Sequence, residues 1–254
     1  MSQYLERFRA DGKVAVVTGA SSGLGLGFAR AMGSIGASVV VAARRRQRLD
    51  DLCCVLEADG ITAHPVVMDV TDPEQCKELA RATVDQFGSL DILVNNAGVG
   101  GSIPSHKEPP EHFRAVVDVN LMGTYWMAQA AAAAMRPGSA IVNIASLHGL
   151  TASRFPQAAY SASKAGVLGL TRDLASQWSM RREIRVNALC PGYVETEMTS
   201  EAIGPLRAMV EQNSILGRLG RQEEIDSALI FLATDASSYM TGAALMVDGG
   251  YSVV

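Results

Sequence analysis

Short runs of apolar, β-branched residues recur along the chain, separated by longer stretches with the spacing of amphipathic helices. The apolar runs predict strands at 14–17, 38–42, 63–67, 90–94, 140–144, 185–189 and 244–247. The helical stretches include 73–87, 111–135, 157–178 and 223–233. Strands that alternate with helices join through right-handed crossovers into a parallel sheet covered on both faces. The pattern therefore predicts an α/β fold with a doubly wound parallel sheet of about seven strands.

The length of 254 residues, 48% of them hydrophobic, allows one α/β domain as readily as two small ones. No linker rich in Pro, Gly or Ser divides the chain, so we predict a single domain over 1–254. The chain has 22 Lys and Arg against 26 Asp and Glu, a formal net charge of −4, which argues against nucleic-acid and anionic-membrane partners. No stretch approaches the ~18 apolar residues of a membrane helix, and no secretory signal begins the chain. We expect a soluble, cytoplasmic protein.

Neither the cysteines nor the histidines have the spacing of a metal site. The cysteines have no CxxC spacing and are expected to be reduced thiols: Cys53, Cys54, Cys76 and Cys190. The histidines have no HExxH spacing: His64, His106, His112 and His148. We therefore predict no bound metal. His148 follows Ser146 by two positions, so it is equally compatible with facing a substrate and with facing solvent.

A glycine-rich turn, TGASSGLG at 18–25, follows the first predicted strand and precedes a helix. Its glycines allow a tight turn, a close backbone approach to phosphate oxygens and close packing of the next helix. Free N–H groups at the helix start would face an anion. The spacing is GxxxGxG rather than GxGxxG, and 24 glycines in the chain make chance clusters possible. The order of strand, turn and helix nevertheless favours dinucleotide binding by Gly19, Ser21, Ser22, Gly23, Leu24 and Gly25.

The end of the second strand bears on the choice of cofactor. NAD-binding sheets present an acidic residue there to the ribose 2′-OH, whereas an arginine accommodates a 2′-phosphate. This chain has no acid there and reads Ala43-Arg44-Arg45-Arg46. The planar guanidinium of Arg44 can contact a phosphate and stack on adenine. Arg45 and Arg46 are also compatible with a solvated helix start, but the segment as a whole favours NADP(H) over NAD(H).

Tyr160 and Lys164 pair an acid with a group that can tune it. Residues four apart share one face of a helix, so the phenol and the ammonium project toward one point. A cation near a phenol lowers its pKa from about 10, which general acid-base catalysis requires at neutral pH. The alternative is that Tyr160 and Lys164 share a helix face without any catalytic role.

Polar or turn-forming residues follow four of the predicted strands. In strand order these are Asp69, Asn95-Asn96-Ala97-Gly98, Ser146 and Pro191-Gly192. Each could be a turn signal by itself. Because the carboxyl ends of parallel strands meet at one edge of a sheet, where such folds bind ligands, we predict that they share a site.

These motifs, together with Asn120, Thr196 and VDGGY at 247–251, resemble the short-chain dehydrogenase/reductase family over essentially the whole chain. The resemblance implies a Rossmann-type fold and a catalytic set of Asn120, Ser146, Tyr160 and Lys164. By that resemblance, Tyr160 gives a proton to a carbonyl or takes one from an alcohol. Lys164 lowers the phenol pKa and holds the nicotinamide ribose, while Ser146 binds the carbonyl oxygen. Asn120 supports a water in a proton relay.

The resemblance also implies binding residues beyond the glycine turn and the arginines. Cofactor contacts are expected from Asp69, Val70, Asn96, Ala97, Gly98, Tyr160, Lys164, Pro191, Gly192, Val194 and Thr196. A substrate-covering loop is expected at about 192–217, and its bulky, adaptable side chains suit a partly apolar ketone. Substrate contacts are expected from Ser146, His148, Tyr160, Tyr193 and Met198.

We therefore predict an NADP(H)-dependent enzyme that interconverts a small-molecule ketone and a secondary alcohol. General carbonyl reductases, 3-oxoacyl-carrier-protein reductases and sugar or polyol dehydrogenases such as gluconate 5-dehydrogenases all remain open. The 14 positions between Ser146 and Tyr160 weaken the 3-oxoacyl branch without removing it. A non-catalytic dinucleotide sensor would lack one or more of the four catalytic residues, and this chain has all four. Family analogy implies a homotetramer, paired through the helices at 111–135 and 157–178.

Overall fold

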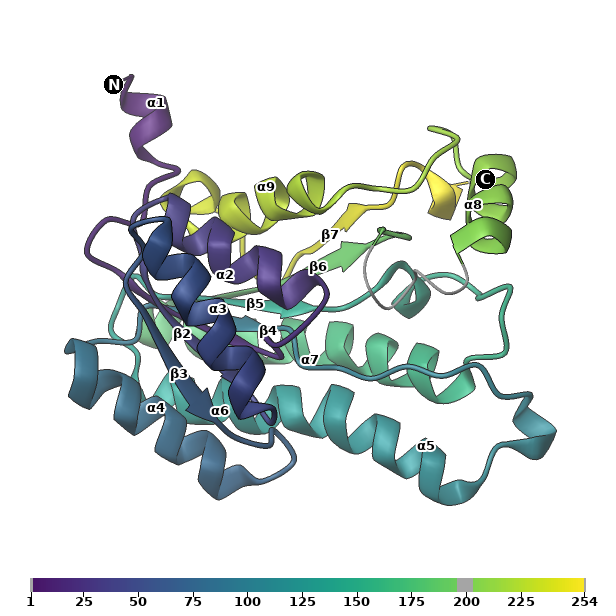
Figure 1. Cartoon of the computed structure of the whole chain (residues 1–254), viewed down its shortest axis with the longest axis horizontal. Coiled ribbons are helices and arrows are strands. Elements are labelled where there is room, and N and C mark those ends of the chain that lie inside the picture. Colours follow the sequence, from purple (N-terminus) through teal and green to yellow (C-terminus); the bar gives the residue numbers. More distant parts are fainter. Residues whose placement is uncertain (1, 196–202, 254) are drawn as a thin grey trace.

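A seven-stranded parallel sheet forms the centre of the molecule, with strand order β3-β2-β1-β4-β5-β6-β7 (Figure 1). The computed structural model describes residues 2–195 and 203–253. The strands are β1 (Val14–Thr18), β2 (Ser38–Ala43), β3 (Ala63–Val67), β4 (Ile92–Asn95), β5 (Ala140–Ile144), β6 (Arg185–Pro191) and β7 (Ala244–Val247). The predicted Rossmann-like α/β domain is confirmed, and the bounds of every strand lie within two residues of those expected. Pairing of Cys190 and Pro191 with β7 extends β6.

Helices cover both faces of the sheet, as Figure 1 shows. The longer helices are α2 (Leu24–Ser34), α3 (Arg46–Ala58), α4 (Pro73–Phe87), α5 (Pro110–Val117), α6 (Gly123–Ala134), α7 (Ala158–Arg182), α8 (Ile203–Asn213) and α9 (Gln222–Ala233), and a short α1 (Gln3–Glu6) precedes the sheet. One core includes Val17, Phe28 of α2 and Leu229 of α9. The other includes Val16 and residues of α4, α6 and α7. Neighbouring residues of β1 thus serve opposite cores, because side chains alternate across a strand.

The helix expected at 111–135 is interrupted by a single π-helical turn, Asp118–Met122, between α5 and α6. The N–H of Gly123 donates to the carbonyl of Asp118, one residue further than in an α-helix. Gly123 lets this segment approach the chain after β3, because a Cβ there would lie 2.7 Å from Val70 Cγ2. The turn buries Asn120 completely, and Thr124 Oγ1 donates to its carbonyl at 2.8 Å.

A buried carboxylate, Asp91, ties the start of β4 to its neighbours. It accepts hydrogen bonds from the backbone of Val14 (3.0 Å), from Ser89 Oγ (2.6 Å) and from Arg136 Nη2 (3.0 Å). Burial raises the pKa of Asp91, but these three donors outweigh it and leave the pKa below its usual value. The carboxylate therefore stabilises the fold while it is ionised.

We expect Asp91→Ala to lower the free energy of unfolding by about 2–4 kcal/mol at pH 7, because it leaves buried donors without an acceptor. Urea denaturation measures this change. The pKa is depressed in the folded state, so the stabilisation is present above the unfolded pKa of about 4 and is lost as the pH falls through the folded pKa. The difference between wild type and variant should therefore shrink below about pH 4. Arg136→Ala, at the exposed partner, should cost about 1 kcal/mol or less.

In the part of the chain that the structure describes, no helix has the length and apolar character needed to span a membrane. All four cysteines are free thiols, and Cys53 and Cys54 lie on α3 as the helical pattern suggested.

Candidate active site

A cavity of about 600 Å³ opens at the carboxyl ends of the strands, next to the point between β1 and β4 where the strand order reverses. The structure brings most of the predicted site residues to its walls. They are Gly19, Ser21, Ser22, Gly23, Leu24, Arg44, Arg45, Asp69, Val70, Asn96, Ala97, Gly98, Ser146, His148, Tyr160, Lys164, Pro191, Gly192, Tyr193 and Val194. Gly25 and Asn120 lie behind the walls, and Thr196 and Met198 fall outside the described residues.

The glycine turn fits closely against the end of β4. Gly19 has φ +65°, and a Cβ there would lie 2.7 Å from Ala97 Cα, so only glycine is accommodated. A Cβ on Gly25 would collide with the carbonyl of Gly19. Asn96 holds the turn from the other side, with Nδ2 donating to Thr18 O at 3.0 Å and to Gly19 O at 3.3 Å.

Gly23, at the entrance to α2, has φ +57° and open space where a Cβ would stand. Gly23 is the N-cap of α2 and has no side chain to cap it, so the first N–H groups of the helix can face an anion. The turn therefore fits a dinucleotide pyrophosphate, which needs bare backbone within reach.

The two arginines after β2 differ in their surroundings. Arg45 Nη2 donates to Ser21 Oγ and Ser22 Oγ, each at 2.9 Å, and so braces the glycine turn. Arg44 has a side chain 69% exposed, with Nη1 3.9 Å from Asp69 Oδ2. Arg45 is thus more than part of a solvated helix start, while Arg44 presents its charge at the mouth of the cavity.

Tyr160 and Lys164 share one face of α7, and Lys164 Nζ lies 5.7 Å from the centre of the Tyr160 ring. Nζ donates to the carbonyl of Ile144, at the end of β5, at 2.7 Å. Burial lowers the pKa of Lys164 to about 8. Burial also raises the pKa of Tyr160, while hydrogen bonding to Ser146 acts in the opposite direction. The expected lowering of the phenol pKa is thus wrong for the protein by itself, because loss of solvent around the phenolate outweighs the hydrogen bond with Ser146.

Ser146 follows β5 in an extended conformation and caps a short 3-10 turn, Leu147–Gly149, by accepting from His148 N at 3.2 Å. Asn120 uses its amide to join two walls of the site. Its Oδ1 accepts from Val99 N at 2.8 Å, and its Nδ2 donates to Val99 O at 2.9 Å and to Ser163 Oγ at 3.0 Å.

His148 lines the cavity and is only 5% exposed, so the structure places it against the candidate substrate space rather than in solvent. Gln157 and the segment 99–101 also line the cavity, and Tyr251 contacts Tyr193, although neither feature was predicted from the sequence. Gln157 precedes Tyr160 by three positions at the start of α7, and Tyr251 ends the C-terminal VDGGY motif. Closeness to a motif was their only signal in the sequence.

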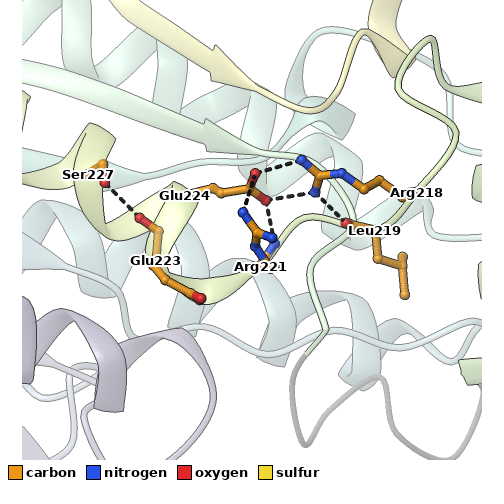
Figure 2. A network of polar contacts seen from close by, with 6 residues as sticks. All are labelled: Arg218, Leu219, Arg221, Glu223, Glu224 and Ser227. Atoms are coloured by element: carbon orange, nitrogen blue, oxygen red, sulfur yellow. Dashed lines mark hydrogen bonds and ion pairs between the residues drawn. The ribbon is translucent and has the colours of Figure 1, made fainter.

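A bridge joins the first residues of the expected loop to the chain just after it. Val194 pairs with Gly220, and Gly220 N donates to Tyr193 O at 2.9 Å. Next to this bridge, Glu224 at the start of α9 accepts from Arg218 at 2.7 and 2.8 Å, as Figure 2 shows. It also accepts from the backbone N–H of Arg221 at 2.8 Å. Hydrogen bonding to Arg218 above all lowers the pKa of Glu224 to about 2, so the carboxylate stays charged.

Among residues 2–195 and 203–253, no three His, Cys, Asp or Glu side chains are grouped as a metal ion would require.

Comparisons with known proteins relate nearly the whole chain to dehydrogenases and reductases. A family model described as enoyl-(acyl carrier protein) reductase matches residues 19–252. The chain is 39% identical to the 3-oxoacyl-(acyl-carrier-protein) reductase of Thermotoga maritima, over 95% of this chain and 98% of that one. It is 41% identical to the L-tagatose-forming galactitol 2-dehydrogenase of Cereibacter sphaeroides, over 98% and 99% of the two chains.

Two solved structures share the fold throughout. A short-chain type dehydrogenase/reductase from Mycobacterium marinum superposes with a TM-score of 0.94 at 36% identity, over 99% of this chain and all of that one. A gluconate 5-dehydrogenase from Burkholderia cenocepacia, in complex with NADP and tartrate, superposes with a TM-score of 0.92 at 33% identity, over 98% and 99%.

Proposed function

Because the chain belongs to the short-chain dehydrogenase/reductase family of oxidoreductases, which act on CH–OH and C=O groups, we propose that it interconverts a ketone and a secondary alcohol with NADP(H). One observation carries the proposal. Ser146, Tyr160 and Lys164 line the same cavity as a glycine turn that leaves backbone bare for a pyrophosphate. A binding module would need the turn but not the acid and base beside it.

The cofactor would be held along one side of the cavity. The turn at 19–25 takes the pyrophosphate, Arg44 and Arg45 face the 2′-phosphate, and Asp69 and Val70 flank the adenine. The backbone of 96–98 and of 191–194 lines the remaining length. The gluconate 5-dehydrogenase of the same fold was solved with NADP, which supports this assignment. When bound, the nicotinamide supplies or accepts the hydride.

The side chains on the other wall bind the substrate oxygen and transfer its proton. Ser146 donates to the oxygen and stabilises the negative charge that grows there during reduction. Tyr160 gives that oxygen its proton, and takes it back when an alcohol is oxidised. Lys164 holds the ribose and supplies positive charge beside the phenol, opposing the effect of burial on its pKa. Asn120 keeps the loop after β4 against α7, and with it the Tyr160 wall.

The pKa of Lys164, lowered to about 8 by burial, predicts how cofactor affinity depends on pH. The ammonium is the form that donates to a ribose hydroxyl, and it predominates below pH 8. We expect the NADPH dissociation constant to be constant between about pH 7 and 8 and then to rise, by at most tenfold per pH unit. Fluorescence titration of NADPH measures it. Lys164→Met should bind NADPH more weakly, with a dissociation constant that depends less on pH. A wild-type dissociation constant that depends on pH no more than that of the variant would contradict the assigned role.

The proposed activity is tested by assaying a panel of ketones with NADPH and NADH, and a panel of secondary alcohols with the oxidised cofactors. Consumption of NADPH with formation of the alcohol supports the proposal. Tight NADPH binding without turnover of any substrate would instead favour a dinucleotide sensor. We also propose a homotetramer by family analogy, and a sedimentation mass of one subunit at micromolar concentration would refute it.

A further inference from the structure

A buried histidine and two tyrosines form a polar and aromatic wall that the proposed reaction leaves without a role. His148 follows Ser146 in the turn after β5, Tyr193 follows β6, and Tyr251 comes from the C-terminal turn. The ring centres of His148 and Tyr193 lie 5.5 Å apart at 71°, and those of Tyr193 and Tyr251 lie 5.3 Å apart at 70°. These edge-to-face contacts fix the Tyr193 ring between the other two.

The hydrogen bonds of His148 identify its tautomer. Its Nε2 lies 2.9 Å from the Tyr193 hydroxyl, whereas its buried Nδ1 has no partner among the described residues. Burial lowers the pKa of His148, so the ring is neutral and carries one N–H. An unpaired N–H costs more than an unpaired lone pair in a buried place, where orphaned donors are rare. The proton therefore sits on Nε2, and His148 donates to the Tyr193 oxygen.

With its oxygen accepting from His148, the Tyr193 hydroxyl retains its own proton for donation. Burial above all, and then the neighbouring Tyr251, raises the pKa of Tyr193, while a hydrogen bond with Ser153 acts in the opposite direction, so the phenol stays protonated. Ser146 accepts from the backbone N–H of His148, whose ring contacts Tyr193, so these three residues lie on one side of the cavity. Tyr251 directs its own hydroxyl to Met209 Sδ at 3.9 Å. Tyr193 lines the cavity, so a bound substrate can compete with the Tyr251 oxygen for its O–H.

The charges of the cavity indicate which oxygen would accept this proton. Among the described residues that line it, the cationic side chains are Arg44, Arg45 and Lys164. The two arginines stand by the glycine turn, and the lysine faces the proposed ribose site. The wall of His148 and Tyr193 is uncharged. A substrate carboxylate placed there would lose its hydration without gaining a cation, whereas a hydroxyl group would lose little.

We propose that His148 orients Tyr193 as a donor to a hydroxyl group beside the reacting carbon, so that the enzyme selects uncharged hydroxyketones and the vicinal diols they form. Tyr193 is the specificity-determining residue, and His148 is a positioning residue that acts through it. This inference rests on the proposed function and narrows its substrate class. A simple ketone would make no such hydrogen bond with Tyr193, and one net hydrogen bond is worth about 0.5–1.5 kcal/mol, or roughly 2- to 13-fold in kcat/KM.

Three four-carbon substrates with the carbonyl at carbon 2 test the inference: 1-hydroxybutan-2-one, butan-2-one and 2-oxobutanoate. The wild type should prefer the hydroxyketone over both others in kcat/KM with NADPH. Tyr193→Phe should lower the ratio of hydroxyketone to ketone by about 10-fold. The intrinsic reactivity of each carbonyl is the same for every variant and cancels in that comparison. A wild type that prefers 2-oxobutanoate, or an unchanged ratio in Tyr193→Phe, overturns the inference.

Two amide substitutions separate positioning from packing. The amide nitrogen of glutamine overlaps Nε2 of histidine, and that of asparagine overlaps Nδ1. His148→Gln should keep most of the hydroxyl preference, whereas His148→Asn should lose it to the same extent as Tyr193→Phe. Equal loss of the hydroxyl preference in both variants would show that the His148 ring serves packing. A preference retained only in His148→Asn would assign the contact to Nδ1. Either result overturns the inference. His106→Phe, at an exposed histidine outside the cavity, is the matched control and should change neither ratio.

A binding measurement separates this inference from the proposed function. Calorimetry compares the hydroxyketone with butan-2-one on the NADPH complex of Tyr160→Phe, with and without His148→Asn. Turnover by the wild type with no hydroxyl preference rejects the inference and keeps the proposed function. If the complex binds the hydroxyketone more tightly than butan-2-one, His148→Asn removes this difference and the wild type shows no turnover, the inference is kept and the proposed function is rejected. If the wild type shows no turnover and the variant binds no hydroxyketone, both the inference and the proposed function are rejected.

Discussion

Tyr160→Phe is expected to lower kcat for ketone reduction by about 10²- to 10⁴-fold while leaving NADPH affinity nearly unchanged. The substitution keeps the ring, which packs beside Lys164 Nζ, and removes the one proton proposed to reach the substrate oxygen. Steady-state kinetics with a good ketone measures kcat, and fluorescence titration measures the affinity for NADPH.

Tyr239→Phe is the matched control, because the Tyr239 side chain is fully exposed and lies outside the cavity. It should leave kcat within about twofold, since substitutions at such exposed positions rarely perturb a protein. If Tyr160→Phe kept near-normal kcat with every ketone that the wild type reduces, another group would have to be the general acid.

The double substitution Ala43→Asp with Arg44→Ala is expected to change the cofactor preference. Ala43 and Arg44 line the cavity at the end of β2, where we expect the 2′-phosphate. Removing the guanidinium loses a charge-assisted hydrogen bond of about 1.5–3 kcal/mol, and the new carboxylate repels the phosphate and offers the 2′-OH of NADH an acceptor. Together these effects should shift the ratio of kcat/KM for NADPH over NADH by roughly 100- to 1,000-fold toward NADH.

Arg44→Ala alone should move this ratio by about 10- to 100-fold. Arg46→Ala is the control, because Arg46 pairs with Asp50 on the surface of α3 and should leave the ratio unchanged. Both cofactors are compared with one ketone that the wild type reduces well. A wild type that prefers NADH, or a ratio that the double substitution does not move, would refute NADP(H) as the cofactor.

The sequence by itself determined the order of the seven strands and their alternation with helices. Buried parallel strands must be apolar almost throughout, so 14–17 and 140–144 stand out from their surroundings without reference to the rest of the chain. It also identified the glycine turn, because a backbone conformation such as that of Gly19 excludes other residues locally. Residues four apart on a helix share a face by helical geometry alone, which paired Tyr160 with Lys164.

The tertiary structure alone decided what depends on contacts between distant segments. The π-helical turn at 118–122 arises where Gly123 meets Val70, and no pattern within 111–135 indicates that contact. The raised pKa of Tyr160 follows from burial, which outweighs the hydrogen bond with Ser146, and burial depends on the segments that pack around the phenol. His148 could be assigned to the cavity, and its proton to Nε2, only when β6 had brought Tyr193 beside it, 45 positions further along the chain. Local sequence specifies local conformation, whereas solvent exclusion and hydrogen-bond partners depend on which segments the fold brings together.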